Sequence, residues 1–205
     1  MRKGLIACIG MIIGLVLLLV AFFGPWYTIQ GTGSLGADYN IRFFLERLEA
    51  KGTFMGNVLS LSMNYAEASV NEGNIGVNTN SFAVIDMAMR LTILAVVSAV
   101  ISVIGMLAFV LQKGKSQSMK YLGGGFGMLT FVLAIVPAVY FMTTGFAEDS
   151  TGFWFTGTVL GVTLSGDPGY AWYLMIVTSI VALISSAAML MKKITPAEPA
   201  PPTIT

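Results

Sequence analysis

Asp86 and Arg90 are the charged residues whose types and spacing could do chemistry, because they stand four residues apart, one turn of a helix. They lie beside a long apolar run, and charges close to membrane depth are costly and often functional. The pair could therefore form an ion or ligand site. The same spacing also fits a salt bridge that ties the end of a helix to a neighbouring sheet, and the sequence leaves both interpretations open.

The rest of the chain offers little catalytic or metal-binding chemistry. It contains no histidine, and Cys8 is its single cysteine. Zinc sites, haem with two histidine ligands, histidine-based triads and intrachain disulfides all need residues that this chain lacks. We expect no cofactor, no metal ion and no enzymatic activity, and the net charge of +1 gives no indication of a nucleic-acid partner.

Long charge-free runs predict the elements that position these residues. Of 205 residues, 56% are hydrophobic and 10% are charged, whereas soluble proteins carry about 25% charged residues. Four runs are long enough for the roughly 20 residues that cross a hydrocarbon core as a helix. The predicted spans are residues 5–26, 86–112, 121–144 and 169–191, and the second includes Asp86 and Arg90 ahead of its charge-free run at residues 91–112. We expect residues 1–193 to form one integral membrane domain and the Pro-rich residues 194–205 to form a disordered cytoplasmic tail.

The basic residues near the span ends predict the orientation. One side of the predicted membrane carries seven basic residues and one acid, and the other carries four basic residues and nine acids. Basic residues concentrate on the cytoplasmic side. We therefore expect a multi-pass protein of the cell membrane with both termini in the cytoplasm and two outer loops, at about residues 27–83 and 145–168.

The outer loops contain patterns of both helix and strand. Apolar residues at helical spacing between residues 41 and 48 predict a short amphipathic helix. Alternation over residues 58–65 predicts a strand, and the Asn- and Gly-rich residues 71–81 predict a turn. Residues 153–164 have the aromatic and β-branched content of a strand or hairpin, and residues 166–169 are expected to break the chain before the last span. Because a lone hairpin is marginally stable, we expect strands from both loops to share one small antiparallel sheet.

Small residues and a proline mark two features within the spans. Gly10 and Gly14 form a GxxxG pattern, which lets helix backbones approach closely in lipid. The pattern fits packing within the four-helix bundle and also fits dimerisation. Pro137 is expected to kink the third span, either as an ordinary feature of a membrane helix or as a hinge.

Phe153, Trp154 and Phe155 are three consecutive aromatic residues in the second outer loop. Strand alternation sends only one set of side chains inward, so one of the two sets must face away from the buried side. An outward aromatic side chain either enters the lipid interface or docks on a neighbouring protein. Both uses remain open.

The chain resembles the claudin, peripheral myelin protein and epithelial membrane protein superfamily. Trp26 follows the first span where claudins carry a signature tryptophan, Arg90 in DMAMRLTIL corresponds to the signature arginine, and Pro137 corresponds to the proline of the third span. The first loop has neither the Gly-Leu-Trp tripeptide nor the cysteine pair of claudins. The resemblance implies a claudin-like fold, an all-α transmembrane four-helix bundle with a small extracellular antiparallel β-sheet built from both outer loops.

These features favour a non-enzymatic membrane protein that acts by lateral assembly or adhesion through its extracellular domain. Its partners would be the lipid bilayer and either further copies of itself or another membrane protein. The alternative is an auxiliary subunit of a channel, a transporter or a membrane enzyme complex.

Overall fold

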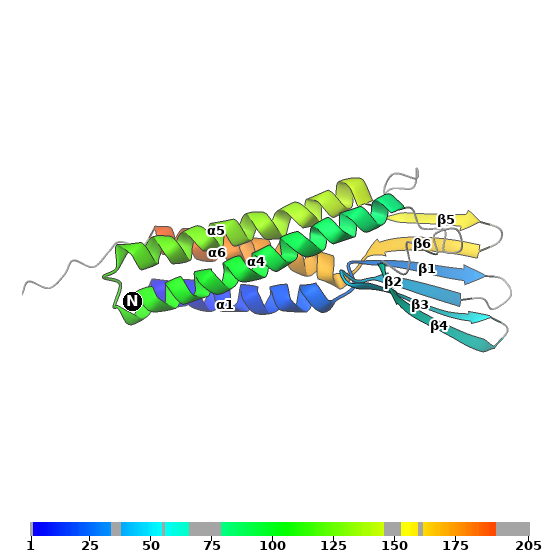
Figure 1. Ribbon diagram of the computed structural model, residues 1–205, viewed down its shortest axis with the longest axis horizontal. Coiled ribbons are helices and arrows are strands. Elements are labelled where there is room, and N and C mark those ends of the chain that lie inside the picture. Colours follow the sequence, from blue (N-terminus) through cyan, green and yellow to red (C-terminus); the bar gives the residue numbers. More distant parts are fainter. Residues whose placement is uncertain are drawn as a thin grey trace, which may run out of the picture.

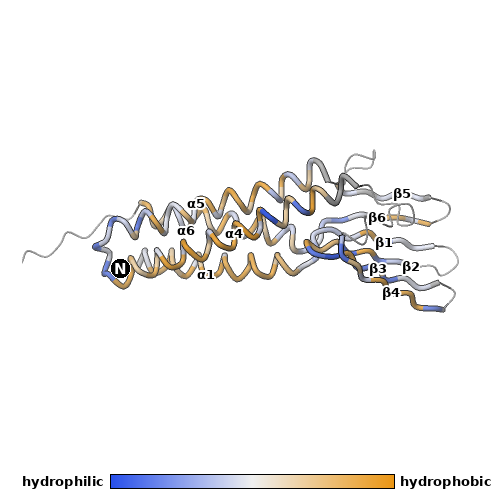
Figure 2. Tube along the Cα trace, in the orientation of Figure 1, coloured by the Kyte–Doolittle hydropathy of each residue, from blue (hydrophilic) through white to orange (hydrophobic). Residues whose placement is uncertain are grey.

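The computed structural model describes residues 2–33, 38–54, 56–65, 79–145, 153–159 and 162–191. Its long helices are α1 (Arg2–Phe23), α4 (Thr79–Leu111), α5 (Gln117–Tyr140) and α6 (Tyr170–Leu190). A π-helical turn, η1 (Phe141–Gly145), follows α5. All four helices are long and apolar enough to cross a membrane, and Figure 2 shows that they are hydrophobic along most of their length.

The helices form a bundle in which α1 packs against α4 and α6, and α5 also packs against α4 and α6. The sheet extends from one end of this bundle, and α1 begins and α6 ends at the other end (Figure 1). With 33 residues, α4 begins seven residues before the predicted start of its span. The helix begins before Asp86 because a charged residue ends an apolar run but does not end a helix. Residues 79–81, predicted as part of a turn, belong to its first turn, whereas residues 71–78 and the tail 194–205 lie outside the described residues.

Helices α4 and α5 approach one another at two glycines. A Cβ atom built on Gly123 would lie 2.7 Å from the backbone nitrogen of Met106 and 3.1 Å from the carbonyl carbon of Gly105. The side chain of Ser102 donates a hydrogen bond of 2.6 Å to the carbonyl oxygen of Gly123 across this contact. Small residues therefore let the two backbones touch, as is common for helices in lipid.

The sheet is antiparallel and has six strands in the order β4-β3-β2-β1-β6-β5. The strands are β1 (Tyr27–Gly33), β2 (Asp38–Phe43), β3 (Arg47–Phe54), β4 (Asn57–Asn64), β5 (Phe155–Val159) and β6 (Val162–Pro168). Because β1 pairs with β6, the segment between α1 and α4 and the segment between η1 and α6 contribute to one sheet.

The predicted amphipathic helix at residues 41–48 is wrong, because the chain there forms the hairpin of β2 and β3. The backbone N–H of Phe44 donates to the carbonyl of Arg47 at 2.9 Å and closes the turn. The hydroxyl of Tyr65 donates to the carbonyls of Phe44 and Arg47. Phe44 and Leu45, which produced the helical spacing, are buried turn residues.

The chain break predicted at residues 166–169 is shorter than expected and falls at Gly169. Strand β6 continues through Gly166, Asp167 and Pro168 in register with β1, and α6 begins at Tyr170, directly after Gly169. Pro168 is the last residue of its strand, where a missing N–H disturbs the ladder least.

Candidate functional site

An aromatic cluster joins the bundle to the sheet, and Phe153 lies at its centre. The ring of Phe153 lies 5.4 Å from that of Tyr27, 6.1 Å from that of Phe141 and 5.3 Å from that of Trp172, measured between centroids. Only 5% of Phe153 is exposed. The carbonyl of Phe153 also accepts a 2.7 Å hydrogen bond from the Tyr27 hydroxyl. These contacts make Phe153 part of the core that connects three segments of the chain.

Trp154 points to the outside of this cluster, since 47% of its surface is exposed. Its ring packs edge-on against Phe153, at 4.8 Å, and against Trp172, at 6.1 Å. The third residue of the triplet, Phe155, opens β5 opposite Gly166. Adjacent aromatic residues 153 and 154 thus have opposite environments, and Trp154 offers an exposed aromatic surface held in place by two buried rings.

Trp26 is buried at the same junction and connects the end of α1 to strand β2 and to Gly169, the residue between β6 and α6. Its indole Nε1 donates to the carbonyl of Ala21 at 3.1 Å, at the end of α1. Its backbone N–H donates to Phe43 at 2.7 Å, and its carbonyl accepts from Gly169 at 2.8 Å. Trp26 therefore combines a side chain that caps α1 with a backbone that hydrogen-bonds to two other segments.

Asp86 and Arg90 form an ion pair of 2.9 Å within α4. The side chains are 49% and 75% exposed, respectively, so neither is buried within the bundle. The partner of the Arg90 guanidinium lies on the same helix, and the pair by itself gives α4 no link to the sheet.

Gly10 and Gly14 face α6 of the same chain. A Cβ atom on Gly10 would clash with Ser185 Oγ, and one on Gly14 would lie 3.5 Å from Val181 Cγ1. Pro137 is buried within α5, which continues to Tyr140 before the π-helical turn. The carbonyl next to it, on Ala138, accepts a 2.9 Å hydrogen bond from the indole of Trp172.

Among the described tyrosines outside the four long helices, the pKa is raised most strongly at Tyr27 and Tyr65. Burial raises the pKa of Tyr65 well above its usual value, although the positive charge of Arg47 acts in the opposite direction. Burial, with a smaller contribution from the negative charge of Asp167, likewise raises the pKa of Tyr27. Both hydroxyls donate to backbone carbonyls, so they act here as neutral structural donors.

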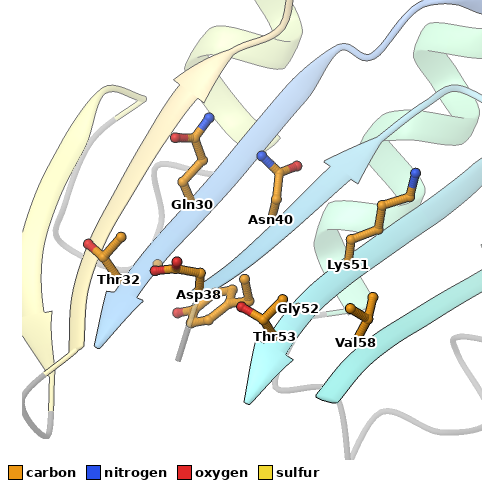
Figure 3. Close-up of a pocket in the computed structure, with 10 residues that line it drawn as sticks. Gln30, Thr32, Asp38, Asn40, Lys51, Gly52, Thr53 and Val58 are labelled. Carbon is orange, nitrogen blue, oxygen red and sulfur yellow. The ribbon is translucent and has the colours of Figure 1, made fainter. Parts of the chain in front are cut away.

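The two faces of the sheet differ in chemistry because side chains alternate along every strand. Gln30, Asn40 and Lys51 are cross-strand neighbours on one face, in register across β1, β2 and β3. With Asp38 and Thr53 they line a shallow hollow of about 400 Å³, to which Tyr39 and Val58 also contribute (Figure 3).

The opposite face is apolar. Close to the helices its side chains are buried, as Tyr27, Phe43 and Leu48 are. Farther along the strands it opens into a second hollow of about 370 Å³. This apolar hollow is lined by Tyr39, Ile41, Ala50, Lys51, Gly52, Leu59, Ser60 and Leu61.

Strand β4 forms one edge of the sheet and borders the apolar hollow. Nearly all of its residues are exposed, and Val58, Leu59 and Leu61 are 76%, 66% and 49% exposed. The sequence NVLSLSMN contains neither a charged residue nor a proline. The alternation of β4 is visible in the sequence, but its position at an edge depends on strand order, which the sequence does not reveal.

The described part of the chain contains no group of three or more His, Cys, Asp or Glu side chains that could hold a metal ion. No protein-family model matches the sequence. No curated protein is significantly similar to it. The exposed edge strand β4 and the apolar hollow together form the candidate interaction surface of the described part of this chain.

Proposed function

We propose that this protein is a non-enzymatic, multi-pass protein of the cell membrane with a claudin-like architecture, and that it acts by lateral assembly or adhesion through its sheet. The observation that carries the proposal is β4, an exposed, uncharged edge strand beside an apolar hollow. Proteins usually protect such edges with charges, prolines or a covering segment, because unpaired backbone groups recruit other strands. An edge without these protections is suited to protein association.

The distribution of charge supports an extracellular sheet. The connection from α4 to α5 and the start of α1 lie at the end of the bundle away from the sheet (Figure 1). This end carries Lys113, Lys115 and Lys120 together with the basic N-terminal residues. The segments that contain the sheet carry most of the acids. Basic residues favour the cytoplasmic side, so the sheet would face out and both termini would face in.

Topology is tested with single cysteines in a Cys8→Ser background. A membrane-impermeant maleimide should label Ser60→Cys, on the sheet, in intact cells, and should label Lys115→Cys only after permeabilisation. The reverse pattern would contradict the proposed orientation.

Assembly is tested by extracting the membrane protein in polymer nanodiscs and measuring particle mass by mass photometry. The proposal expects particles that contain more than one copy of the chain. A constant complex with a different membrane protein would favour an auxiliary subunit of a channel, transporter or enzyme complex instead. Particles with a single copy and no other protein would contradict assembly.

A further inference from the structure

Strand β4 has a backbone edge that its own sheet leaves open. Among the described strands, β4 pairs with β3 on one side and forms the end of the sheet on the other. In an antiparallel ladder, alternate residues direct their N–H and C=O groups to opposite sides. About half of the eight residues of β4 therefore present donors and acceptors outward, over a length suited to another strand of similar size.

The other edge, β5, is less suited to pairing. It has five residues, against eight in β4, and Gly157 lies at its centre. Glycine weakens a strand because it provides no side chain for cross-strand packing. A partner strand gains more hydrogen bonds and more side-chain contacts at β4.

The sequence of β4 is complementary to an antiparallel copy of itself. When Leu61 lies opposite Leu61 of a second copy, Leu59 lies opposite Met63 and Ser60 lies opposite Ser62. Apolar side chains then meet on one face and hydroxyls meet on the other, and both kinds of cross-strand pair are stabilising. No charged residue of β4 opposes this arrangement.

The apolar hollow extends this complementarity beyond the edge. Leu59 and Leu61 form its border on β4, and Ile41 and Ala50 continue it over β2 and β3. A two-fold axis through the paired edges would place the hollows of two copies side by side on the same face. Closed two-fold dimers are the commonest homo-oligomers, and their contacts join the same patch on both subunits.

We propose that the protein forms a two-fold symmetric dimer through antiparallel pairing of β4 with β4 of a second copy, in the register that sets Leu61 opposite itself. The proposal rests on the proposed function and names its partner as a second copy of this chain. The two sheets join into one continuous sheet of twelve strands. Because the strands run along the long axis of the bundle (Figure 1), antiparallel pairing directs the two bundles away from one another, so this contact serves adhesion between opposing membranes and not lateral assembly within one membrane.

Single-cysteine cross-linking tests the register in the full chain, purified in mild detergent, with Cys8→Ser as background. Directly opposite residues in an antiparallel pair have Cα atoms about 4.5–5.5 Å apart, which is within the range of about 4.4–6.8 Å for a disulfide. Leu61→Cys should therefore form a covalent dimer under mild oxidation. Ser60→Cys, whose opposite residue is Ser62, should form much less, and Thr156→Cys on β5 should form none.

A charge substitution tests the same contact without relying on cysteine chemistry. Leu61→Lys would place two ammonium groups opposite one another across the axis, so the dimer should separate into single copies by mass photometry. Thr163→Lys is the matched control, because it adds the same charge at an exposed position on the interior strand β6, and it should leave the dimer intact.

The possible outcomes separate this inference from the proposed function. If wild-type particles contain several copies but Leu61→Cys does not cross-link and Leu61→Lys leaves them intact, the β4 dimer is wrong and assembly occurs elsewhere. Strong cross-linking through Thr156→Cys would overturn the choice of edge. If wild-type particles contain one copy and no partner, the function itself is wrong.

Discussion

Substitution of Gly123 by alanine tests whether direct backbone contact holds α4 and α5 together. The added Cβ would lie 2.7 Å from the nitrogen of Met106, whereas ordinary contacts begin at 3.4 Å. The neighbouring atoms include backbone, which cannot rotate away as a side chain can. The two helices must therefore separate locally by about 0.7 Å, the difference between these two distances.

The cost of this separation follows from the contacts it disturbs. Forcing one extra carbon into a packed interior typically costs about 1–3 kcal/mol. The hydrogen bonds from Ser102 to Gly123 and from Ser98 to Phe126, at 2.6 and 2.8 Å, would also lengthen. Hydrogen bonds between membrane helices are worth about 0.6 kcal/mol each. Together these effects give a destabilisation of about 2–4 kcal/mol. The intrinsic preference of helices for alanine over glycine offsets part of this loss.

Gly125 provides the matched control, because it belongs to the same helix and a Cβ atom there meets no described atom within 4 Å. Gly125→Ala should be neutral or stabilising by up to about 1 kcal/mol, the intrinsic helix preference for alanine. The assay is unfolding by SDS in mixed micelles, followed by tryptophan fluorescence. We expect Gly123→Ala to unfold at a lower SDS fraction than wild type and Gly125→Ala at an equal or higher fraction. Identical unfolding of the two variants would refute the close contact.

Three further predictions concern the junction and the ion pair. Phe153→Ala should cost about 3–5 kcal/mol, as for other buried aromatic residues, whereas Trp154→Ala should leave the SDS unfolding profile nearly unchanged; equal losses would contradict their opposite exposures. Arg90→Ala should change the unfolding free energy by less than about 1 kcal/mol, as for other exposed ion pairs, and a larger loss would indicate a partner beyond Asp86. Because the folded-state pKa values of Tyr27 and Tyr65 are raised, their contribution to stability should be complete below about pH 10, where unfolded tyrosine ionises, and should be lost as the pH rises above it. An alkaline titration followed by tyrosinate absorbance checks this, and ionisation of all tyrosines before unfolding would contradict it.

The four helices were predictable because the cost of burying charge in lipid leaves long charge-free runs in the sequence. The strands at residues 58–65 and 153–164 were predictable from alternation and β-branched content. The β2–β3 hairpin was not, because Phe44 and Leu45 in its turn mimic the spacing of an amphipathic helix. The competing signal was the alternation of residues 38–43, in which Tyr39, Ile41 and Phe43 share one face.

The candidate interaction surface was only partly visible in the sequence. The aromatic triplet pointed to the second outer loop, whereas β4 and the apolar hollow lie in the first. Alternation did imply that residues 153 and 154 differ in burial. The sequence could not indicate that β4 lies at an edge, because strand order depends on the pairing of β1 with β6 across more than a hundred residues. Nor could it show that Gly10 faces Ser185, since a GxxxG pattern does not specify its partner helix.

The junction at Trp26 has a mechanical consequence. Helix α1 leads into β1 within a few residues, β6 leads directly into α6, and both the two strands and the two helices are neighbours. Hydrogen bonds from Gly169 to Trp26 and from Ala171 to Pro25 brace the crossing point. At these two crossings, which lie within the described residues, no linker separates strand from helix, so the sheet and the α1–α6 pair should move together as a rigid lever in which the helix pair is the longer arm. A lateral pull on the sheet would be transmitted as torque on these two helices, so bilayer thickness and lateral tension should influence the angle at which the sheet meets its neighbours.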